Sequence, residues 1–391
     1  MNILYISPSI IPSRSANSIH VTSMCQELAI LGHNVSLIAA TRLNNRFDAN
    51  SSLKEFYGAD SINLTLVAKK IINPRGIEFF ISLLALYVYI KLCISKNTPN
   101  LIISRNLYSA FLFSCVLRKK IIYETHSPES GIRMKFQKMV LRSNKVKAVV
   151  ISEALKIIMI SKYDISNSRI TVLHDAAKSF QKRASHTQRK NKQHNLLSSK
   201  VDLSSFDKVI GYFGHLYSGR GIEIIEGLAK IHKKHAFIVY GGNKEEISYY
   251  QQKNTSNNLF FMGHVSPKKA SILMLAMDIL LMPYQESVSI GIDSIDTVKW
   301  MSPMKMFEYM ACGVPIISSD LSVLKEVLID NHNSLLVKPN DIEDWALAIQ
   351  RISNSSDLQE MLGKNAFYDY REKHTWNIRA KAFIKLNANV V

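Results

Sequence analysis

The G-x-G-x-x-G turn is missing after the first strand-like segment of this chain of 391 residues. The loop after its first strand-like segment, residues 7–17, contains no glycine, so the G-x-G-x-x-G turn that holds the pyrophosphate of NAD or FAD is absent. This absence argues against a dinucleotide-dependent redox enzyme. The loop is instead rich in hydroxyl side chains and leads into a helix N-terminus, which suits a sugar or a phosphate.

Cysteine and an export signal are also scarce or absent. The chain has four cysteines, none in a C-x-x-C pair and all among apolar neighbours: Cys25, Cys93, Cys115 and Cys312. We interpret them as reduced core residues of a cytosolic protein, with neither metal nor disulfide. No basic n-region or cleavage site precedes the first strand-like segment, so we expect a cytoplasmic protein.

The sequence has no long uninterrupted apolar run. Its most apolar segment, Ile77–Ile94, contains Glu78 and Lys91, which leave 12 uncharged residues between them. A bilayer core needs roughly 20 apolar residues. We therefore expect a buried helix here, packed between the sheet and a partner surface, rather than a membrane span.

Negative charge is scarce in the first half only. Residues 1–176 hold 22 Lys and Arg against 10 Asp and Glu, residues 177–206 hold 7 against 1, and residues 207–391 hold 20 of each. This asymmetry predicts an acidic partner for the first half, such as lipid headgroups, a phosphorylated substrate or nucleic acid. A solubilising surface is the alternative.

Strand-like and helical patterns alternate along the chain, which is typical of an α/β protein with parallel sheets, and the length suggests two domains. A polar stretch, residues 178–206, separates two series and is interpreted as a linker. The first helix is expected to begin near Asn17 or Ser18 and to end at Gly32. Strands are expected at residues 3–6, 35–40, 101–104, 121–124, 148–151 and 170–173, and then at 209–213, 236–240, 259–262, 279–282, 314–318 and 334–337.

The residue after the strand at 121–124 is a candidate for chemistry, because parallel sheets place ligands at the carboxyl ends of their strands. His126 lies there and can hydrogen-bond a substrate hydroxyl or a leaving phosphate; a structural role is equally compatible with its position. The following segment, residues 131–142, is basic and amphipathic. It fits a helix that rests on an anionic membrane, or an ordinary surface helix.

Two segments of the second half predict a nucleotide site. Residues 211–221 carry four glycines and Arg220 between a strand and a helix, where a backbone can approach a phosphate and a guanidinium can bind it. Residues 302–315 begin with Ser-Pro and place Lys305 and Glu308 one turn apart on one helix face. A cation for phosphate and a carboxylate for ribose hydroxyls suit a nucleoside diphosphate; a solvated ion pair is the plainer alternative.

These residues resemble family 4 of the retaining glycosyltransferases, which have the GT-B fold. Residues 15–35 resemble the family's acceptor-side opening, residues 302–315 its donor-site helix, and residues 376–379 the start of its C-terminal helix. The resemblance implies two Rossmann-like doubly wound domains that face each other across a cleft. It implies an acceptor-side domain at residues 1–177, a linker at 178–206, a donor-binding domain at 207–373, and a helix at 374–391 that crosses back to the first domain.

The resemblance also implies a function. The expected reaction moves a sugar, with retention, from a nucleoside-diphosphate sugar to a glycan or lipid-linked acceptor in bacterial surface polysaccharide synthesis. No metal and no cofactor are expected. The expected partners are the nucleotide sugar, the acceptor and an anionic membrane surface that the basic first domain contacts, without nucleic acid. The expected location is the cytoplasmic face of the inner membrane.

The residues that the resemblance assigns fall into three groups. The catalytic residues are His126 and Glu308; the diphosphate-binding residues are Arg220, Lys305 and His215; the nucleotide-binding residues are Gly214, Gly241, Val265 and Glu308. Two departures stand out: position 300 is Trp where the family usually has a second glutamate, and His215 replaces a phosphate-binding arginine. Asp293 or Asp296 is the expected substitute for the missing sugar-facing carboxylate, and Lys305 is expected to carry more of the phosphate charge.

Two other functions are compatible with the same pattern. A non-hydrolysing sugar-nucleotide 2-epimerase also has two such domains, but it acts on the donor alone and leaves the basic first half unexplained. A non-catalytic partner subunit that keeps the fold is the other, and Trp300 favours it.

Overall fold

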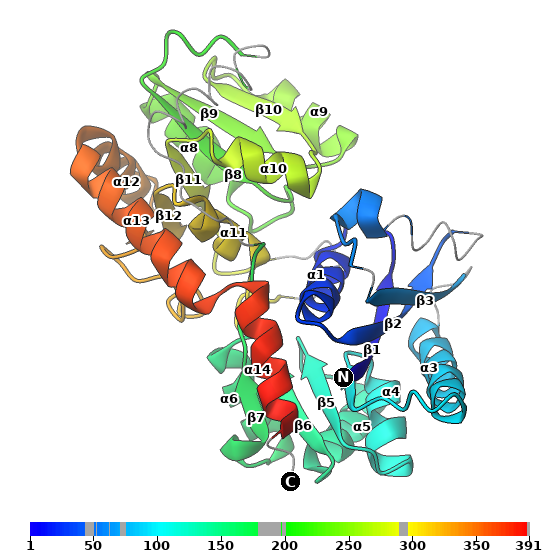
Figure 1. Cartoon of the computed structure of the whole chain (residues 1–391). Helices are drawn as coiled ribbons and strands as arrows, with labels where there is room; N and C mark the ends of the chain where they lie inside the picture. The colour runs from blue at the N-terminus through cyan, green and yellow to red at the C-terminus, as the bar shows by residue number, and fades with distance from the viewer. Residues whose placement is uncertain are drawn as a thin grey trace. The chain divides into compact units, whose positions relative to one another are not determined.

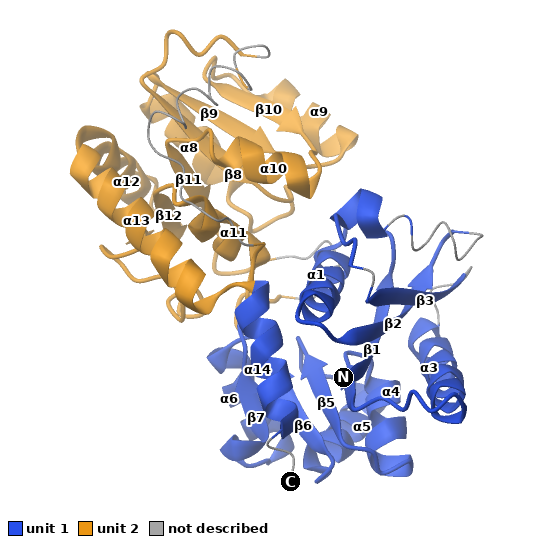
Figure 2. Cartoon of the chain, viewed as in Figure 1, with its two compact units in different colours: residues 1–175, 376–391 blue, residues 176–375 orange. Residues whose placement is uncertain are grey.

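The structure, a computed structural model, describes residues 1–43, 51, 53–61, 63–70, 76–178, 197, 201–288 and 296–388. The chain divides into two compact units: Met1–Asp175 with Trp376–Val391, and Ala176–Thr375 (Figure 2). The chain thus passes from one unit to the other twice, after residue 175 and after residue 375. Most of the linker expected at 178–206 lies outside the described residues.

The first unit contains a seven-stranded parallel sheet in the order β3-β2-β1-β4-β5-β6-β7 (Figure 1). β1 lies between β2 and β4, so the strand order reverses there, and ligands of such sheets bind outside the carboxyl ends at this reversal. The strands are β1 (Asn2–Ile10), β2 (Asn34–Thr41), β3 (Leu64–Lys70), β4 (Leu101–Ser104), β5 (Ile121–Thr125), β6 (Val146–Val150) and β7 (Ile170–Val172).

Helices connect these strands in the crossover manner that parallel sheets require. The helical elements of the unit are α1 (Ala16–Ile30), α3 (Ile77–Ile94), α4 (Leu107–Phe111), α5 (Gly131–Arg142), α6 (Glu153–Tyr163) and α14 (Trp376–Ala388), with single turns η1 (Leu53–Tyr57), η2 (Leu112–Val116) and η3 (Asn167–Arg169). Every strand expected in this half is present. β3 was not expected, because it lies at the sheet edge and its half-exposed alternating pattern lacks a continuous apolar run.

Two expectations about helices of the first unit are wrong. α1 begins two residues earlier than expected, because the Ser15 side chain caps it by accepting a hydrogen bond from the Ser18 backbone N–H. The segment Ile77–Ile94 does form a helix, but only 22% of it is buried. One face packs on the unit and the other is exposed. Among the described residues, α3 alone is long and apolar enough to cross a membrane by length and composition.

The second unit repeats the same plan with six parallel strands in the order β10-β9-β8-β11-β12-β13. The order reverses between β8 and β11. Every strand expected in this half is present: β8 (Lys208–Phe213), β9 (His235–Tyr240), β10 (Leu259–Gly263), β11 (Ile279–Met282), β12 (Ile316–Ser319) and β13 (Leu335–Val337). Its helices are α8 (Ile222–Ile231), α9 (Lys244–Lys253), α10 (Pro267–Met274), α11 (Met304–Cys312), α12 (Ile342–Asn354) and α13 (Ser356–Lys373).

Helix α11, which carries Lys305 and Glu308, is fixed at both ends and along one face. It begins after Pro303, and Gly313 ends it in the left-handed conformation with φ 61°. α13 packs against it so closely that a Cβ added to Gly363 would lie 2.3 Å from the Gly313 carbonyl oxygen. The glycine at position 363 of α13 therefore allows α13 to pack closely against α11, the helix that bears the candidate site.

Replacing Gly363 by alanine should destabilise the second unit by roughly 1–3 kcal/mol, because the new methyl group meets backbone that cannot yield. Gly227→Ala is the matched control, since it is also a helical glycine but its Cβ would meet only the mobile end of Ile342, at 2.9 Å. Alanine favours a helix over glycine by about 1 kcal/mol, so the control should be neutral or stabilising. Urea unfolding measures both; equal effects would contradict the close packing of α13 on α11.

Candidate active site

The residues expected to bind a donor gather at the carboxyl edge of the second sheet, where its order reverses. β8 leads into the loop at residues 214–221, β11 leads into Pro283 and Tyr284, and α11 begins beside them. The Lys305 ammonium lies 4.3 Å from the ring centre of Tyr212 and 4.5 Å from that of Tyr284. The two rings thus hold the ammonium by cation–π attraction.

Arg220 joins this cluster from the loop after β8. Its Nη1 donates a hydrogen bond to the Tyr284 hydroxyl at 3.0 Å, and its guanidinium lies 5.1 Å from the centre of the same ring. Tyr284 therefore contacts both cations. Two positive side chains side by side, held by aromatic rings, form a natural place for a dianion.

Neither charged group on α11 forms a close ion pair within the described residues. Lys305 and Glu308 are both half-buried, and no ion pair or hydrogen bond of either is found among the described residues. Burial and the neighbouring Arg220 hold the pKa of Lys305 well below its ordinary value, and burial raises the pKa of the Glu308 carboxyl. The solvated ion pair considered from the sequence does not form, so both groups keep their capacity for a ligand.

The nucleotide-binding glycines meet at the same edge. A Cβ on Gly241 would lie 1.7 Å from the Gly214 carbonyl oxygen, and Gly241 has a φ of 137°. A Cβ on Gly214 would lie 3.2 Å from the Lys305 ammonium, so this glycine leaves the ammonium accessible from its side. Val265 follows β10, the strand beyond β9, and is half-buried. The structure thus brings Gly214, Gly241 and Lys305 together.

His215 stacks on Tyr217 with ring centres 4.7 Å apart. Burial, together with Arg220 and Lys305, lowers its pKa, so the imidazole is neutral at pH 7. A neutral imidazole can donate a hydrogen bond to a phosphate but adds no charge. Most of the positive charge at this edge therefore belongs to the other two side chains.

Of the two residues expected to replace the sugar-facing carboxylate, Asp293 and Asp296, the structure describes only Asp296. Asp293 lies outside the described residues. Asp296 uses one carboxylate oxygen, Oδ1, to accept hydrogen bonds from the backbone N–H groups of Val288 and Val298, each at 3.0 Å. Burial raises its pKa, but these two bonds outweigh that effect and lower it. The carboxylate therefore holds its own loop, with a further hydrogen bond from the Ser287 side chain.

In the first unit a buried carboxylate organises the region around His126. Glu124, in β5, is 1% exposed. Its Oε1 lies 3.0 Å from Arg379 Nη2, 3.0 Å from His126 Nε2 and 3.0 Å from His20 Nε2. Its Oε2 accepts a bond from the Tyr5 hydroxyl at 3.2 Å. Burial raises the pKa of Glu124, but the adjacent positive groups outweigh it and hold the pKa well below its usual range.

Residues at both chain crossings belong to this cluster. Asp175 Oδ1 lies 2.9 Å from His20 Nδ1, and the Trp376 ring lies edge-on to His20 at 4.8 Å. Arg379 also donates to the His174 and Leu173 carbonyls. The sequence suggested none of these partners, although a glutamate in an otherwise apolar strand is a signal of a compensated buried charge.

His126 lies beside Glu124 and Arg105, with 29% of its side chain exposed. Arg105 Nη2 lies 3.2 Å from His126 Nδ1 and 2.9 Å from Nε2. A proton on Nε2, donated to Glu124, leaves Nδ1 to accept from Arg105 and satisfies all three groups. Burial and the Arg105 charge lower the pKa of His126 to about 4, so the ring is neutral at pH 7.

The ligand atoms of His20, Glu124 and His126 lie within 4.8 Å of one another, a grouping that could hold a metal ion. The guanidinium of Arg379 already lies 3.0 Å from the shared carboxylate oxygen, and Arg105 lies 2.9 Å from the His126 nitrogen. A cation placed there would face two guanidinium groups at close range. The charge of the cluster therefore fits an internal ion network better than a metal site.

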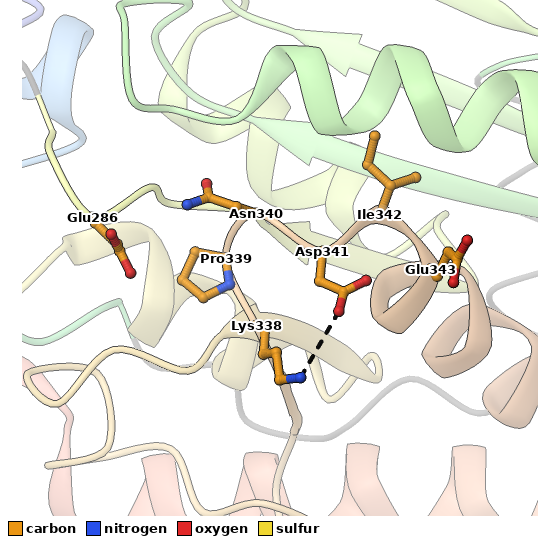
Figure 3. Close-up of a pocket in the computed structure, with 7 residues that line it drawn as sticks. All are labelled: Glu286, Lys338, Pro339, Asn340, Asp341, Ile342 and Glu343. Atoms are coloured by element: carbon orange, nitrogen blue, oxygen red, sulfur yellow. Dashed lines mark ion pairs between the residues drawn. The ribbon is translucent and has the colours of Figure 1, made fainter.

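The second unit also has an open pocket of about 650 Å³ between the loop after β11 and the start of α12 (Figure 3). Its lining side chains include three carboxylates and one lysine, which lies 3.9 Å from Asp341. They are Glu286, Lys338, Pro339, Asn340, Asp341, Ile342 and Glu343. An acidic lining repels a diphosphate, so we assign the donor to the cluster around Lys305 instead.

Two family models match the chain in succession. The model described as Glycosyltransferase Family 4 matches residues 18–176, and the model described as Glycosyl transferases group 1 matches residues 197–368. Each of the two doubly wound parallel sheets lies in the part of the chain that one of these glycosyltransferase models matches. Two such domains in one chain define the GT-B fold class. The chain belongs to family 4 of the GT-B glycosyltransferases.

The chain is also similar in sequence and structure to individual glycosyltransferases. The chain is 26% identical over 187 residues to an uncharacterized glycosyltransferase of Methanocaldococcus jannaschii, which covers 46% of this chain and 45% of that protein. It is 26% identical over 192 residues to an alpha-galactosylglucosyldiacylglycerol synthase of Streptococcus pneumoniae, covering 46% and 47%. These matches thus span about half the length of each relative. The structure of HepE from Anabaena in complex with UDP and glucose has a TM-score of 0.66, 16% identity and 99% coverage of both chains.

Acid should destabilise the first unit through His126 and then Glu124. The folded pKa of His126, about 4, lies below its unfolded value of about 6.5, so its contribution to stability is complete above about pH 6.5 and is lost as the pH falls toward 4. Glu124, whose folded pKa is also depressed, loses its contribution at lower pH still.

His126→Gln should therefore flatten the fall in the free energy of unfolding between pH 6.5 and 4 by roughly 1–3 kcal/mol. Urea unfolding at several pH values measures this. His332→Gln, at an exposed position of the second unit, is the control. A His126 variant that keeps the wild-type pH dependence would show that the pKa of this ring is not depressed.

Proposed function

We propose that this protein transfers a sugar, with retention, from a nucleoside-diphosphate sugar to a glycan or lipid-linked acceptor in bacterial surface polysaccharide synthesis. One observation carries the proposal. At the point where the second sheet reverses its order, Arg220 and Lys305 present two cations, and Glu308 presents a carboxylate on the same helix face as Lys305. Among the residues that the structure describes, neither of these two groups on α11 forms an ion pair within 4 Å.

These charges match the parts of a sugar nucleotide. Lys305 and Arg220 would bind the diphosphate and stabilise its charge as the bond to the sugar breaks. Glu308 would accept hydrogen bonds from the ribose hydroxyls, and the backbone at Gly214 and Gly241 would admit the nucleotide closely. His215 would donate one further hydrogen bond to a phosphate.

Retention follows in our proposal from attack on the face that the diphosphate leaves. The departing phosphate oxygen would accept the proton of the acceptor hydroxyl as the new bond forms, so no enzymic nucleophile is required. His126 would contact the transferring sugar through Nδ1, which requires Arg105 to release that nitrogen. No metal enters this scheme, because the two cations provide the charge stabilisation.

Two observations favour a lipid-linked acceptor. The streptococcal relative is named as the synthase of a glycosylated diacylglycerol, which is a lipid product. Residues 1–176 carry 22 basic against 10 acidic side chains, a charge that suits an enzyme that works on anionic lipid at the cytoplasmic face of the membrane. A lipid-linked acceptor accounts for both observations.

Incubation with a panel of sugar nucleotides tests the function directly. Transfer should require an acceptor, and NMR of the product should show the anomeric configuration of the donor. A sugar that isomerises without any acceptor would instead identify a 2-epimerase. Nucleotide binding without turnover on a broad acceptor panel would identify a non-catalytic subunit.

Glu308→Gln should weaken donor binding roughly tenfold to a hundredfold, because hydrogen bonds to a charged group contribute about 1.5–3 kcal/mol each. Lys305→Ala should weaken the binding of nucleoside diphosphates more than the binding of the bare nucleoside. A bound diphosphate should raise the pKa of Lys305, which the free protein holds low, so wild-type affinity should fall as the pH rises. Lys305→Ala should flatten this pH dependence and reduce the accompanying proton uptake.

Calorimetry in two buffers of different ionisation enthalpy measures both affinity and proton uptake. Lys299→Ala is the matched control, because Lys299 is an exposed lysine in the segment before α11. Wild-type affinities for nucleoside, nucleoside diphosphate and donor in the Glu308 variant would place the donor site elsewhere.

His126→Ala should lower turnover while nucleoside-diphosphate affinity stays close to that of the wild type, because the assigned contact is with the sugar. Steady-state kinetics and calorimetry on the same preparation separate the two effects. His33→Ala, which removes a histidine from the loop before β2, is the control. If the His126 variant loses nucleotide binding or unfolds, the histidine has a structural role only.

A further inference from the structure

Helix α3 carries a continuous stripe of exposed apolar side chains. The stripe consists of Phe79, Phe80, Leu83, Tyr87, Ile90 and Ile94, whose exposed fractions range from 48% to 78%. At 3.6 residues per turn these six positions fall within about 100° of the helix circumference. The opposite face, with Ile81, Ala85 and Val88, is buried. A contiguous apolar surface of this kind marks an interaction site.

The buried face commits α3 to the first unit. Arg133 Nη2 of α5 lies 3.0 Å from Glu78 Oε1, and the Ser109 hydroxyl donates to that of Ser82 at 3.0 Å. The Asn106 amide donates to the Glu78 carbonyl at 2.7 Å. A helix held in this way can offer one face to lipid but cannot be surrounded by it while the unit is folded. It therefore suits the surface of a bilayer rather than a span.

Basic side chains border the carboxyl-terminal half of the stripe. Lys119 lies 6.0 Å from the ring centre of Tyr89, a half-buried residue on the flank of α3 between the stripe and the buried face. The exposed basic residues of this border are Lys91, Lys96, Arg118, Lys119 and Lys120. The acidic residue of the helix, Glu78, is paired with Arg133. The surface thus combines an apolar centre with a positively charged edge.

We propose that α3 lies in the headgroup region of an anionic membrane, with the stripe buried among the upper acyl chains and the basic border at the lipid phosphates. The inference deepens the proposed function and rests on it for the lipid-linked acceptor. A second copy of the chain fits this face less well, because a twofold contact would oppose the two basic borders. An anionic bilayer complements both the apolar stripe and its charge.

Flotation with vesicles of phosphatidylcholine, with and without phosphatidylglycerol, tests the surface. The wild type should float with the anionic vesicles and detach as salt is raised. The double variant Leu83→Gln with Ile90→Gln should lower partitioning into the vesicles by roughly tenfold or more at any salt concentration. The reason is that two aliphatic side chains that would insert into the membrane are lost. Lys119→Gln with Lys120→Gln should lower only the salt-sensitive part. Ile231→Gln with Leu347→Gln, at exposed apolar positions of the second unit, should float like the wild type.

Tyr87→Trp provides a second readout that does not depend on losing binding. Its fluorescence should be quenched by lipids brominated on the upper acyl chain, which requires insertion of the stripe. Absent quenching together with full flotation would show that charge alone binds the protein and would overturn the assignment of α3. A dimer in light scattering that Leu83→Gln with Ile90→Gln dissociates would also overturn it, in favour of a second copy.

Nucleoside-diphosphate calorimetry on the same preparations separates the two proposals. A wild type that binds the nucleotide but no vesicle contradicts the membrane surface and leaves the proposed donor site intact. A protein that floats and binds no nucleotide contradicts the donor site and leaves the membrane surface intact.

Discussion

The Glu124 carboxylate is the contact on which the first unit depends around His126. It is completely enclosed, and an enclosed carboxylate is stable only when other groups supply the charge and hydrogen bonds that water would give. Arg379 supplies the charge from α14, the last helix of the chain, while β5 supplies the carboxylate from the middle of the unit. The ion pair therefore joins segments that are 255 positions apart. It ties the C-terminal helix to the strand that leads into the loop at His126.

In the second unit, by contrast, the two charged groups on α11 form no close ion pair with the residues that the structure describes. Lys305 and Glu308 lie on one helix face, half-buried, and the structure's described residues hold the ammonium with aromatic rings rather than with a carboxylate. An arrangement of this kind costs stability, since burial disfavours both charged forms. A protein keeps such groups unneutralised where a ligand completes them. The contrast between the satisfied network at Glu124 and the groups without a close ion pair at Lys305 is the reason for proposing the donor site at Lys305.

The sequence predicted most of the fold, because strand and helix periodicity are local properties. The twelve expected strands are present, and the missed one, β3, is an edge strand whose exposed side carries Thr65 and Lys69. The sequence also singled out Arg220 and Lys305, and the structure brings both side chains to the ring of Tyr284. It could not show that Tyr212 and Tyr284 flank the ammonium, because these two rings come from different strand ends and meet only through the sheet order.

Helix α3 shows where composition misleads. A run of apolar residues is compatible with burial in a core, with a membrane span and with one exposed face, and only the packing of the neighbours distinguishes them. Here α4 and the sheet cover the face with Ala85, while Leu83 and Ile90 remain uncovered. The uncovered face is as apolar as the covered one, so solubility cannot be the reason for its composition. The membrane surface proposed above would supply a second apolar environment for this face and an anionic one for the positive edge beside it.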